Sequence, residues 1–421
     1  MGPYSEEEVV KLPLLMNESR MRSMMEKEGL DAIVASTGEN IQYLSDSTLS
    51  GYVVLPLEKN LDPFIVTWVA YADKVVDSGT WIKDVKYTGT FFFEYFLGAR
   101  MTDFENRMRA QISPIQKDVE NWYKLQHGGV EGVPGLTDKL FEGLKERNLE
   151  KATIGLEESG TTVTGFESLK KKLPQVKPKF ADKVFNYARM VKTPHELQLF
   201  REGTPMVERG IKAAVAIAKE GVTEQEIFNE YKRAVVSEGA GVAYSQIVEV
   251  GHRSIMPTCG VGVDRSARVQ KGDMIRFNPN VVHKNHPFHM GRTVVLGEPR
   301  DSKLRPYYKA ILAGEDAELA TIKPGVKASE VFSACEKAVK AGGIPHFRRH
   351  HVGHALGLGP AYDQPIISFN DNTVLEEGMV FNLEPNYFEF GLGGLQLEDT
   401  LVVTKNGYEL FTTTSRDLWV I

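Results

Sequence analysis

The sequence predicts an α/β protein built of two domains. Its 421 residues are more than one hydrophobic core usually serves. The first part of the chain alternates short β-like runs with helical ones, whereas long helical patterns begin near Asp182 and a strand-rich stretch runs from Met379 to Ile421. Because such a change of pattern marks a domain boundary, we expect one domain over residues 1–181 and a second over residues 182–421.

The composition is that of a globular protein in a reducing compartment. Hydrophobic residues make up 42% of the chain and charged residues 25%, and the formal net charge of −6 disfavours nucleic acid as a partner. Two cysteines, Cys259 and Cys335, are too few for a disulfide scaffold. The acidic run Glu6 to Glu8 is unlike a secretory signal, and the apolar stretch Pro63 to Ala72 is too short to cross a bilayer. We therefore expect a cytoplasmic protein that has no membrane partner.

In the first domain, the residue pattern predicts a mixed sheet covered by helices. Apolar residues at helical spacing run from Asn17 to Leu30, and Gly29 is expected to end that helix. An aromatic cluster from Phe91 to Phe96 is expected to pack beside the core, with a lid or a subunit contact as the alternative. Apolar runs bounded by turn residues predict strands at Ala32–Ala35, Gly51–Leu57, Pro63–Ala70, Thr153–Leu156 and Lys177–Phe180.

The second domain is expected to carry four long helices. Capping residues such as Thr193 and Thr223 open the first two of them. Helices followed by strands recur on both sides of residues 323–326, which suggests a duplicated half-domain. The predicted helices are Pro194–Lys219, Thr223–Glu238, Ser302–Ala320 and Ser329–Ala341.

Histidines are concentrated in one part of the second domain. Eight of the ten lie between His252 and His354. Neutral imidazoles and carboxylates that converge from several strands are the groups that bind transition metals or move protons in catalysis. Carboxylates within apolar, strand-like runs need a cation or a shared proton, because an unpaired buried charge is costly. The chemically suitable set is His289, His354, Glu384 and Glu398.

Several motifs around these residues occur in the order typical of one known family. The chain resembles the pita-bread family of creatinases, aminopeptidases P and prolidases. This resemblance implies an N-terminal creatinase-like mixed-sheet domain and a C-terminal pita-bread catalytic domain. The motifs are Arg189 to Glu196, Gly272-Asp273 with Arg276-Phe277-Asn278, His289 to Thr293, His351 to Gly357, Gly378 to Pro385, and Leu397 to Thr400.

The resemblance also implies where metal ligands would lie and where this chain differs. The dinuclear peptidases have two aspartates eleven residues apart, and Asn278 and His289 keep that spacing here. A neutral amide is a poor ligand for a hard divalent ion, and an imidazole cannot bridge two ions as a carboxylate does. The site is therefore expected to hold one zinc, iron or manganese ion, or no metal at all as in creatinase. The ligands of a single ion would be His289, His354, Glu384 and Glu398.

Catalytic and substrate-binding roles follow from the same resemblance. Tyr362-Asp363 replaces the dipeptide that the peptidases carry before Pro365, and His252 is the histidine nearest to the position of creatinase's acid/base histidine. Gly291 occupies the position of an active-site glutamate in creatinase. The residues expected to be catalytic are His351, His354, Glu384 and Glu398. The residues expected to bind substrate are His252, Asn278, Tyr362 and Asp363.

The leading functional hypothesis is a hydrolase, or a lyase, that cleaves a carbon–nitrogen or related bond in a small polar molecule with one metal-bound water. The alternatives are a metal-independent amidinohydrolase of the creatinase type, an Xaa-Pro peptidase, and a fold kept only as an interaction module. A purely structural role for the glutamates would pair them with Arg276 or Arg292. A homodimer with a small-molecule substrate is expected.

Overall fold

A computed structural model of the protein describes residues 14–89, 135–256, 264–359 and 363–421. It confirms the α/β fold, and the chain divides into two compact units, Met1–Ala188 and Arg189–Ile421. The helix α9 (Asp182–Met190) crosses this division. The boundary predicted at Asp182 thus coincides with the start of a helix that joins the two units.

The first unit is built on one mixed sheet. Its strands are β1 (Ala32–Ala35), β2 (Gly51–Pro56), β3 (Phe64–Trp68), β4 (Asp84–Thr88), β5 (Thr153–Leu156) and β6 (Lys177–Phe180). Their order is β4-β3-β2-β1-β5-β6, with β1–β2 and β2–β3 antiparallel and the other neighbours parallel. The sequence pattern missed β4, because four of its five residues are only half-buried and show no apolar run.

The ends of the first helix show how local sequence sets its length. The side chain of Asn17 accepts a hydrogen bond from the backbone N of Arg20 at 3.4 Å, and Gly29 adopts the left-handed conformation with φ 64°. The predicted stop at Gly29 is therefore confirmed. The aromatic cluster from Phe91 to Phe96 lies outside the described residues, so its packing stays a prediction. The helices of this unit are α1 (Glu18–Glu28), α2 (Gly38–Ser45), η1 (Val69–Tyr71), α3 (Ala72–Ser78), α7 (Leu136–Glu146) and α8 (Val163–Lys172).

The four long helices predicted for the second unit are confirmed. The first begins with a capping box, in which Oγ1 of Thr193 accepts from the backbone N of Glu196 at 3.2 Å and the Glu196 carboxylate accepts from the backbone N of Thr193 at 2.9 Å. Pro194 occupies the first helical position, where its missing N–H costs nothing. The helices are α10 (Pro194–Ile217), α11 (Glu224–Ser237), α12 (Leu304–Thr321) and α13 (Ala328–Ala341).

Two larger sheets and a hairpin complete the second unit. One sheet has the order β18-β10-β8-β7 with β9 added to β8, and the other has the order β12-β11-β13-β16-β17. The first is formed by β7 (Gly241–Val250), β8 (Met274–His283), β9 (His286–His289), β10 (Arg292–Val295) and β18 (Trp419–Val420). The second is formed by β11 (Gly353–Ala355), β12 (Asp363–Ile367), β13 (Val380–Leu383), β16 (Asp399–Thr404) and β17 (Gly407–Leu410). The hairpin is β14 (Tyr387–Glu389) with β15 (Gly393–Leu395), and the short helix η2 (Gly251–Ile255) follows β7.

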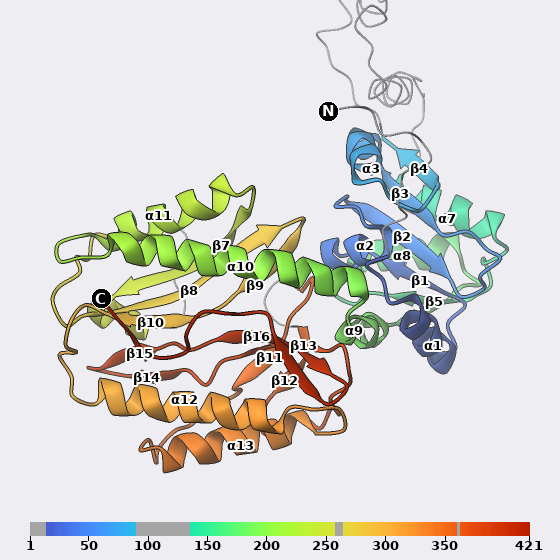
Figure 1. The fold of residues 1–421 in the computed structure, drawn as a ribbon. Coiled ribbons are helices and arrows are strands. Elements are labelled where there is room, and N and C mark those ends of the chain that lie inside the picture. Colours follow the sequence, from blue (N-terminus) through green and yellow to red (C-terminus); the bar gives the residue numbers. More distant parts are fainter. Residues whose placement is uncertain (1–13, 90–134, 257–263, 360–362) are drawn as a thin grey trace, which may run out of the picture. The chain divides into compact units, whose positions relative to one another are not determined.

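Each of the two sheets has its own pair of helices (Figure 1). Helices α10 and α11 pack together beside β7, β8 and β9, whereas α12 and α13 pack together beside the sheet that contains β12. Buried apolar side chains such as Ile311 and Val339 from the second helix pair meet Phe381 and Leu401 from that sheet. This recurrence of a sheet with two helices matches the duplicated half-domain suggested by the sequence. Among the helices described, none is long and apolar enough to span a membrane.

His286 on β9 is a buried histidine whose charged form is disfavoured. Its Nδ1 lies 3.0 Å from the carbonyl oxygen of Lys284, and its Nε2 has no hydrogen-bond partner within the described residues. Burial, with smaller contributions from His195 and Lys192, lowers the pKa of His286 from 6.5 to about 4. The unfolded chain therefore binds a proton near pH 6.5 that the folded protein does not bind until about pH 4, so stability falls as the pH falls through this window.

Replacing His286 by leucine is expected to remove this acid sensitivity. Between pH 7 and pH 4 the wild-type protein should lose on the order of 3 kcal/mol of unfolding free energy that the variant keeps. Urea unfolding at several pH values measures the difference. His346→Gln is the matched control, because the side chain of His346 is 58% exposed. Equal pH slopes in His286→Leu and the wild type would contradict the assignment.

Candidate active site

The histidines and glutamates singled out in the sequence meet in the second unit. His289 ends β9, His354 lies in β11, Glu384 follows β13 and Glu398 precedes β16. Strands β11, β13 and β16 are neighbours in one sheet, and an isolated antiparallel bridge pairs Glu398 with Gly291, which follows β9 in the chain. The site is therefore assembled where the two sheets of the unit approach each other.

Glu384 is the carboxylate at the centre of this group. Its Oε1 lies 2.9 Å from Nδ1 of His351 and 4.0 Å from Nε2 of His354. Its Oε2 accepts a hydrogen bond from Nδ2 of Asn386 at 3.2 Å and lies 3.9 Å from Nη2 of Arg349. Burial raises the pKa of Glu384, but the contact with His351 and the positive charge of Arg349 outweigh burial and hold the pKa below its ordinary value. Glu384 is therefore an ionised carboxylate that faces two imidazoles.

His289 and His354 lie beside each other as neutral rings. Their ring centroids are 5.3 Å apart, and the ring planes are inclined by 31°. Burial lowers the pKa of both, to about 3 for His289. Nδ1 of His354 lies 2.9 Å from the carbonyl oxygen of Ala355, so this nitrogen donates and the lone pair of Nε2 faces Glu384. Both neutral rings can thus accept a hydrogen bond from a bound molecule.

Glu398 is surrounded by four amide side chains. Its Oε1 accepts hydrogen bonds from Nδ2 of Asn278 and of Asn386, each at 2.9 Å, and from Nε2 of Gln396. Its Oε2 accepts from Nδ2 of Asn382 at 3.2 Å. We refer to these four residues as the amide cage. Burial and the neighbouring carboxylate raise the pKa of Glu398 well above its ordinary value, and the bonds from Asn386 and Asn382 offset only part of this rise. Of the two adjacent glutamates, Glu398 is therefore the one whose ionised form is disfavoured.

Gly291 lets the main chain approach this carboxyl group closely. A Cβ atom at position 291 would lie 2.5 Å from Cγ of Gln396 and 3.0 Å from Cγ and Cδ of Glu398. The backbone N of Glu398 donates to the carbonyl oxygen of Gly291 at 3.0 Å, which fixes the separation of the two chains. A glutamate at this position, as the resemblance to creatinase suggests, would not fit beside Glu398 without rearrangement.

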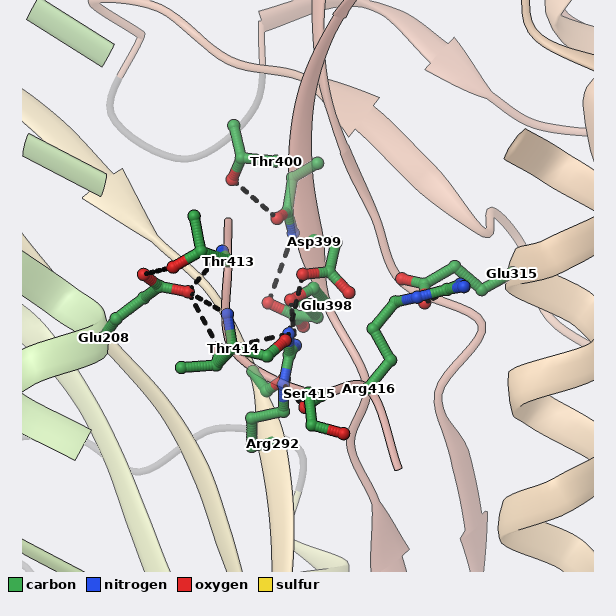
Figure 2. A network of polar contacts seen from close by, with 12 residues as sticks. Glu208, Arg292, Glu315, Glu398, Asp399, Thr400, Thr413, Thr414, Ser415 and Arg416 are labelled. Atoms are coloured by element: carbon green, nitrogen blue, oxygen red, sulfur yellow. Dashed lines mark hydrogen bonds and ion pairs between the residues drawn. The ribbon is translucent and has the colours of Figure 1, made fainter. Parts of the chain in front are cut away.

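The backbone of Glu398 is held by the fully buried side chain of Arg292. Its Nη1 donates to the carbonyl oxygen of Glu398 at 2.6 Å, and its Nη2 pairs with Oδ1 of Asp399 at 2.7 Å. The same guanidinium donates to the carbonyl oxygens of Thr414 at 3.2 Å and Ser415 at 3.1 Å (Figure 2). Arg292 therefore joins β10, the start of β16 and the C-terminal segment at one point.

Glu208 on α10 fixes the same C-terminal segment. Its carboxylate accepts hydrogen bonds from the backbone N and Oγ1 of Thr413, at 2.6 and 2.9 Å, and from the backbone N and Oγ1 of Thr414, at 2.7 and 2.9 Å (Figure 2). Burial opposes ionisation, yet these four bonds hold the pKa of Glu208 below its ordinary value. Helix α10 is thereby linked to Arg292 through Thr414.

Arg276 and Arg292, the two arginines considered as structural partners of the glutamates, pair with carboxylates other than Glu384 and Glu398. Arg292 pairs with Asp399, and Arg276 pairs with Oε2 of Glu249 at 2.7 Å. Within the described ranges, no arginine or lysine forms an ion pair with Glu398. In the structure, neither Arg276 nor Arg292 therefore pairs directly with Glu384 or Glu398.

The residues predicted to bind substrate lie in different places. Asn278 on β8 reaches the site through its bond to Glu398, whereas His252 is exposed on η2 and has no hydrogen bond or ion pair to the site among the described residues. Asp363 on β12 is buried and pairs with Nη2 of Arg189 at 2.7 Å. Tyr362 lies outside the described residues. Substrate contacts by these residues stay predictions.

Sequence reasoning missed Asn382, Asn386 and Gln396, although a signal for them exists. Side chains two residues apart in an extended strand point to the same face of a sheet. Asn382 and Asn386 lie two residues on either side of Glu384, and Gln396 lies two residues before Glu398. Amides at this spacing within apolar runs indicate a buried polar group to which they donate.

The sequence predicts that two imidazoles and two carboxylates surround one ion, with the ligands His289, His354, Glu384 and Glu398. Across residues 14–89, 135–256, 264–359 and 363–421, no group of three or more His, Cys, Asp or Glu side chains is arranged to hold a metal ion. In that part of the chain Glu398 is contacted by amide N–H groups.

Solved structures of known enzymes share this fold over most of the chain. The Xaa-Pro dipeptidase from Bacillus anthracis superposes with a TM-score of 0.75 at 21% identity, covering 96% of this chain and 99% of that one. The X-Pro aminopeptidase from Thermotoga maritima has a TM-score of 0.75 at 23% identity, covering 94% and 100%. At these identities the likeness shows the fold.

Sequence comparisons show the family. The Xaa-Pro dipeptidase of Pyrococcus furiosus is 31% identical over 288 residues, which are 68% of this chain and 81% of that protein. Residues 19–191 match the Creatinase/Prolidase N-terminal domain, and residues 198–405 match metallopeptidase family M24. The two domain matches and the relative at 31% identity agree with one another. The chain therefore belongs to metallopeptidase family M24 and carries a creatinase/prolidase N-terminal domain.

Proposed function

We propose that this chain is a hydrolase that cleaves a carbon–nitrogen bond in a small polar substrate by acid–base catalysis at His351 and Glu384. The observation that carries the proposal is the 2.9 Å contact between Nδ1 of His351 and Oε1 of Glu384 in a buried site. A carboxylate this close to one ring nitrogen of a histidine stabilises the imidazolium that forms when the ring takes up a proton during the reaction, which is the role of the carboxylate beside a general base. Glu398 and His354 complete the site beside this pair.

Membership of a metallopeptidase family implies a divalent metal ion, but the donor set does not fit one at Glu398. A ligand must offer a lone pair, whereas the amides of Asn278, Asn382 and Asn386 turn N–H groups toward the carboxyl group. The same contacts disfavour both a two-ion peptidase centre and the single ion that the sequence analysis grouped around Glu398. The proposed reaction therefore uses only protein side chains and water.

In the proposed reaction, His351 takes a proton from a water molecule as the water oxygen bonds to the substrate carbon. The carbon–nitrogen bond then breaks, and its electron pair stays on the nitrogen. The nitrogen takes the proton back from His351, so the histidine ends as it began. Glu384 stabilises the imidazolium that forms in between, because its ionised Oε1 lies beside the ring.

The neutral histidines are suited to hold the substrate. The Nε2 lone pair of His354 and the ring of His289 can accept hydrogen bonds from N–H or O–H groups of a polar molecule. Burial keeps both rings neutral near pH 7, so they remain acceptors under ordinary conditions. This supports a substrate that carries several donors, such as a guanidino, ureido or amide compound.

A second candidate is the hydrolysis of Xaa-Pro dipeptides. It is favoured by the relatives, since the Pyrococcus furiosus protein named Xaa-Pro dipeptidase is 31% identical over 81% of its length. It would require the divalent metal that the amide cage disfavours. The two candidates therefore differ in metal requirement as well as in substrate.

A substrate panel tests the two candidates together. The wild-type protein is assayed with guanidino, ureido and amide compounds and with Xaa-Pro dipeptides, each after chelator treatment and with added Mn²⁺, Co²⁺ or Zn²⁺. We expect turnover of a non-peptide compound that chelation does not abolish. Turnover of Xaa-Pro dipeptides alone, and only with an added ion, would replace the proposed function by the second candidate.

A further inference from the structure

We infer that the amide cage takes the place of a metal ion at Glu398, and that a chain of buried side chains holds the cage in this donor arrangement. The inference concerns the groups that complement the Glu398 carboxyl, and it does not depend on which bond the enzyme cleaves. It rests on the direction in which each amide faces.

The orientation of Gln396 is determined by Arg276. Nη1 of Arg276 donates to Oε1 of Gln396 at 3.1 Å, and a guanidinium can only donate. The amide oxygen of Gln396 must therefore face Arg276, so its NH₂ group faces Glu398. Arg276 is itself held by Glu249, whose Oε2 lies 2.9 Å from Nε and 2.7 Å from Nη2. A buried chain of hydrogen bonds thus runs from Glu249 through Arg276 and Gln396 to Glu398.

The orientation of Asn386 is determined by the backbone. Its Oδ1 accepts a hydrogen bond from the backbone N of Leu397 at 2.9 Å, and a backbone N–H can only donate. Its Nδ2 therefore points to the two glutamates, at 3.2 Å from Oε2 of Glu384 and 2.9 Å from Oε1 of Glu398. One nitrogen of Asn386 thus donates to both carboxyl groups, to Oε2 of Glu384 and to Oε1 of Glu398.

These orientations oppose a cation electrostatically. The hydrogens of an amide NH₂ group carry partial positive charge, and a divalent ion at Glu398 would meet them instead of lone pairs. To bind, the ion would have to displace or rotate Gln396 and Asn386. Rotation of Gln396 would turn its NH₂ group toward the Arg276 guanidinium. Rotation of Asn386 would leave the backbone N–H of Leu397 without its acceptor. The donors that hold the cage in place therefore also act against its replacement by a metal ion.

The test is the metal content of the full-length protein, compared with that of Glu398 variants. Chelator-treated wild type and Glu398→Gln are incubated with Mn²⁺, Co²⁺ or Zn²⁺, freed of unbound ion and analysed for metal, and the melting temperature is recorded with and without chelator. We expect the two proteins to retain the same amount of each ion and the wild-type melting temperature to be unchanged by chelation. Glu298→Gln serves as the matched control, because the side chain of Glu298 is 84% exposed and pairs with the surface residue Arg305.

The inference is overturned if the wild type retains an ion that Glu398→Gln does not, or if chelation lowers the wild-type melting temperature and Glu398→Gln is insensitive to it. Should Glu398→Gln fail to fold, Glu398→Asp replaces it, since the shorter side chain keeps the carboxyl group but withdraws it from its partners. An ion retained equally by the wild type and the folded variant lies elsewhere and leaves the inference standing. A loss of activity on any substrate would concern the proposed function and would not change the interpretation of the metal content.

Discussion

Replacing Glu384 by glutamine is expected to lower kcat/KM by about 10²–10⁴-fold, because the carboxylate supports proton transfer by stabilising the imidazolium of His351. Glutamine keeps the size of the side chain but removes the negative charge that faces His351 at 2.9 Å. The imidazolium that forms during the reaction would then be uncompensated in a buried site. Steady-state kinetics measures the loss, and it should fall mainly on kcat because the charge matters most when the proton has moved.

The matched control is Glu389→Gln on β14. Glu389 accepts from Tyr387 and pairs with Lys303 at 2.8 Å on a partly exposed face. Its variant should retain nearly full activity. If Glu384→Gln also turns over at close to the wild-type rate, while its circular dichroism and melting temperature show that it is folded, Glu384 has no role in the chemistry.

Replacing Arg292 by methionine is expected to destabilise the protein by about 3–5 kcal/mol, the cost of breaking a buried ion pair from one side. The side chain of Arg292 is fully buried, and its removal leaves Asp399 without its 2.7 Å partner. It also removes one of the hydrogen-bond donors to each of the carbonyl oxygens of Glu398 and Ser415. Denaturant unfolding of the variant at pH 7 measures the change.

Arg305→Met is the comparison for this variant. Arg305 and Glu298 form an ion pair at 3.0 Å whose side chains are 46% and 84% exposed. Breaking a pair of this kind should cost less than about 1 kcal/mol. Equal, small losses for Arg292→Met and Arg305→Met would mean that the network drawn in Figure 2 contributes little to the stability of the second unit.

The fold could be predicted in large part because its helices carry local signals. Thr193 and Glu196 form the capping box that opens α10, and Gly29 ends α1 in the left-handed conformation that glycine favours. The half-buried β4 carries no such signal, since an edge strand with four half-buried residues has no apolar run to recognise. Its place follows from tertiary pairing with β3.

The candidate site could be predicted as a set of residues but not as an arrangement. The family motifs pointed to Glu384, Glu398 and His354, which lie close together in the structure, while their catalytic roles stay predictions. The motifs did not reveal that Asn386 lies between the two glutamates, because amides were considered only as poor ligands and not as donors. Whether a carboxylate faces a metal or an N–H group depends on contacts between strands that are distant in sequence.

The most direct test of the account is the activity of the wild-type enzyme after exhaustive dialysis against a chelator, with metal content measured on the same sample. The account predicts that kcat/KM for the carbon–nitrogen substrate is unchanged when far less than one ion per chain remains. Activity that disappears with the metal, and returns in proportion to the ion added back, would contradict acid–base catalysis by His351 and Glu384 alone.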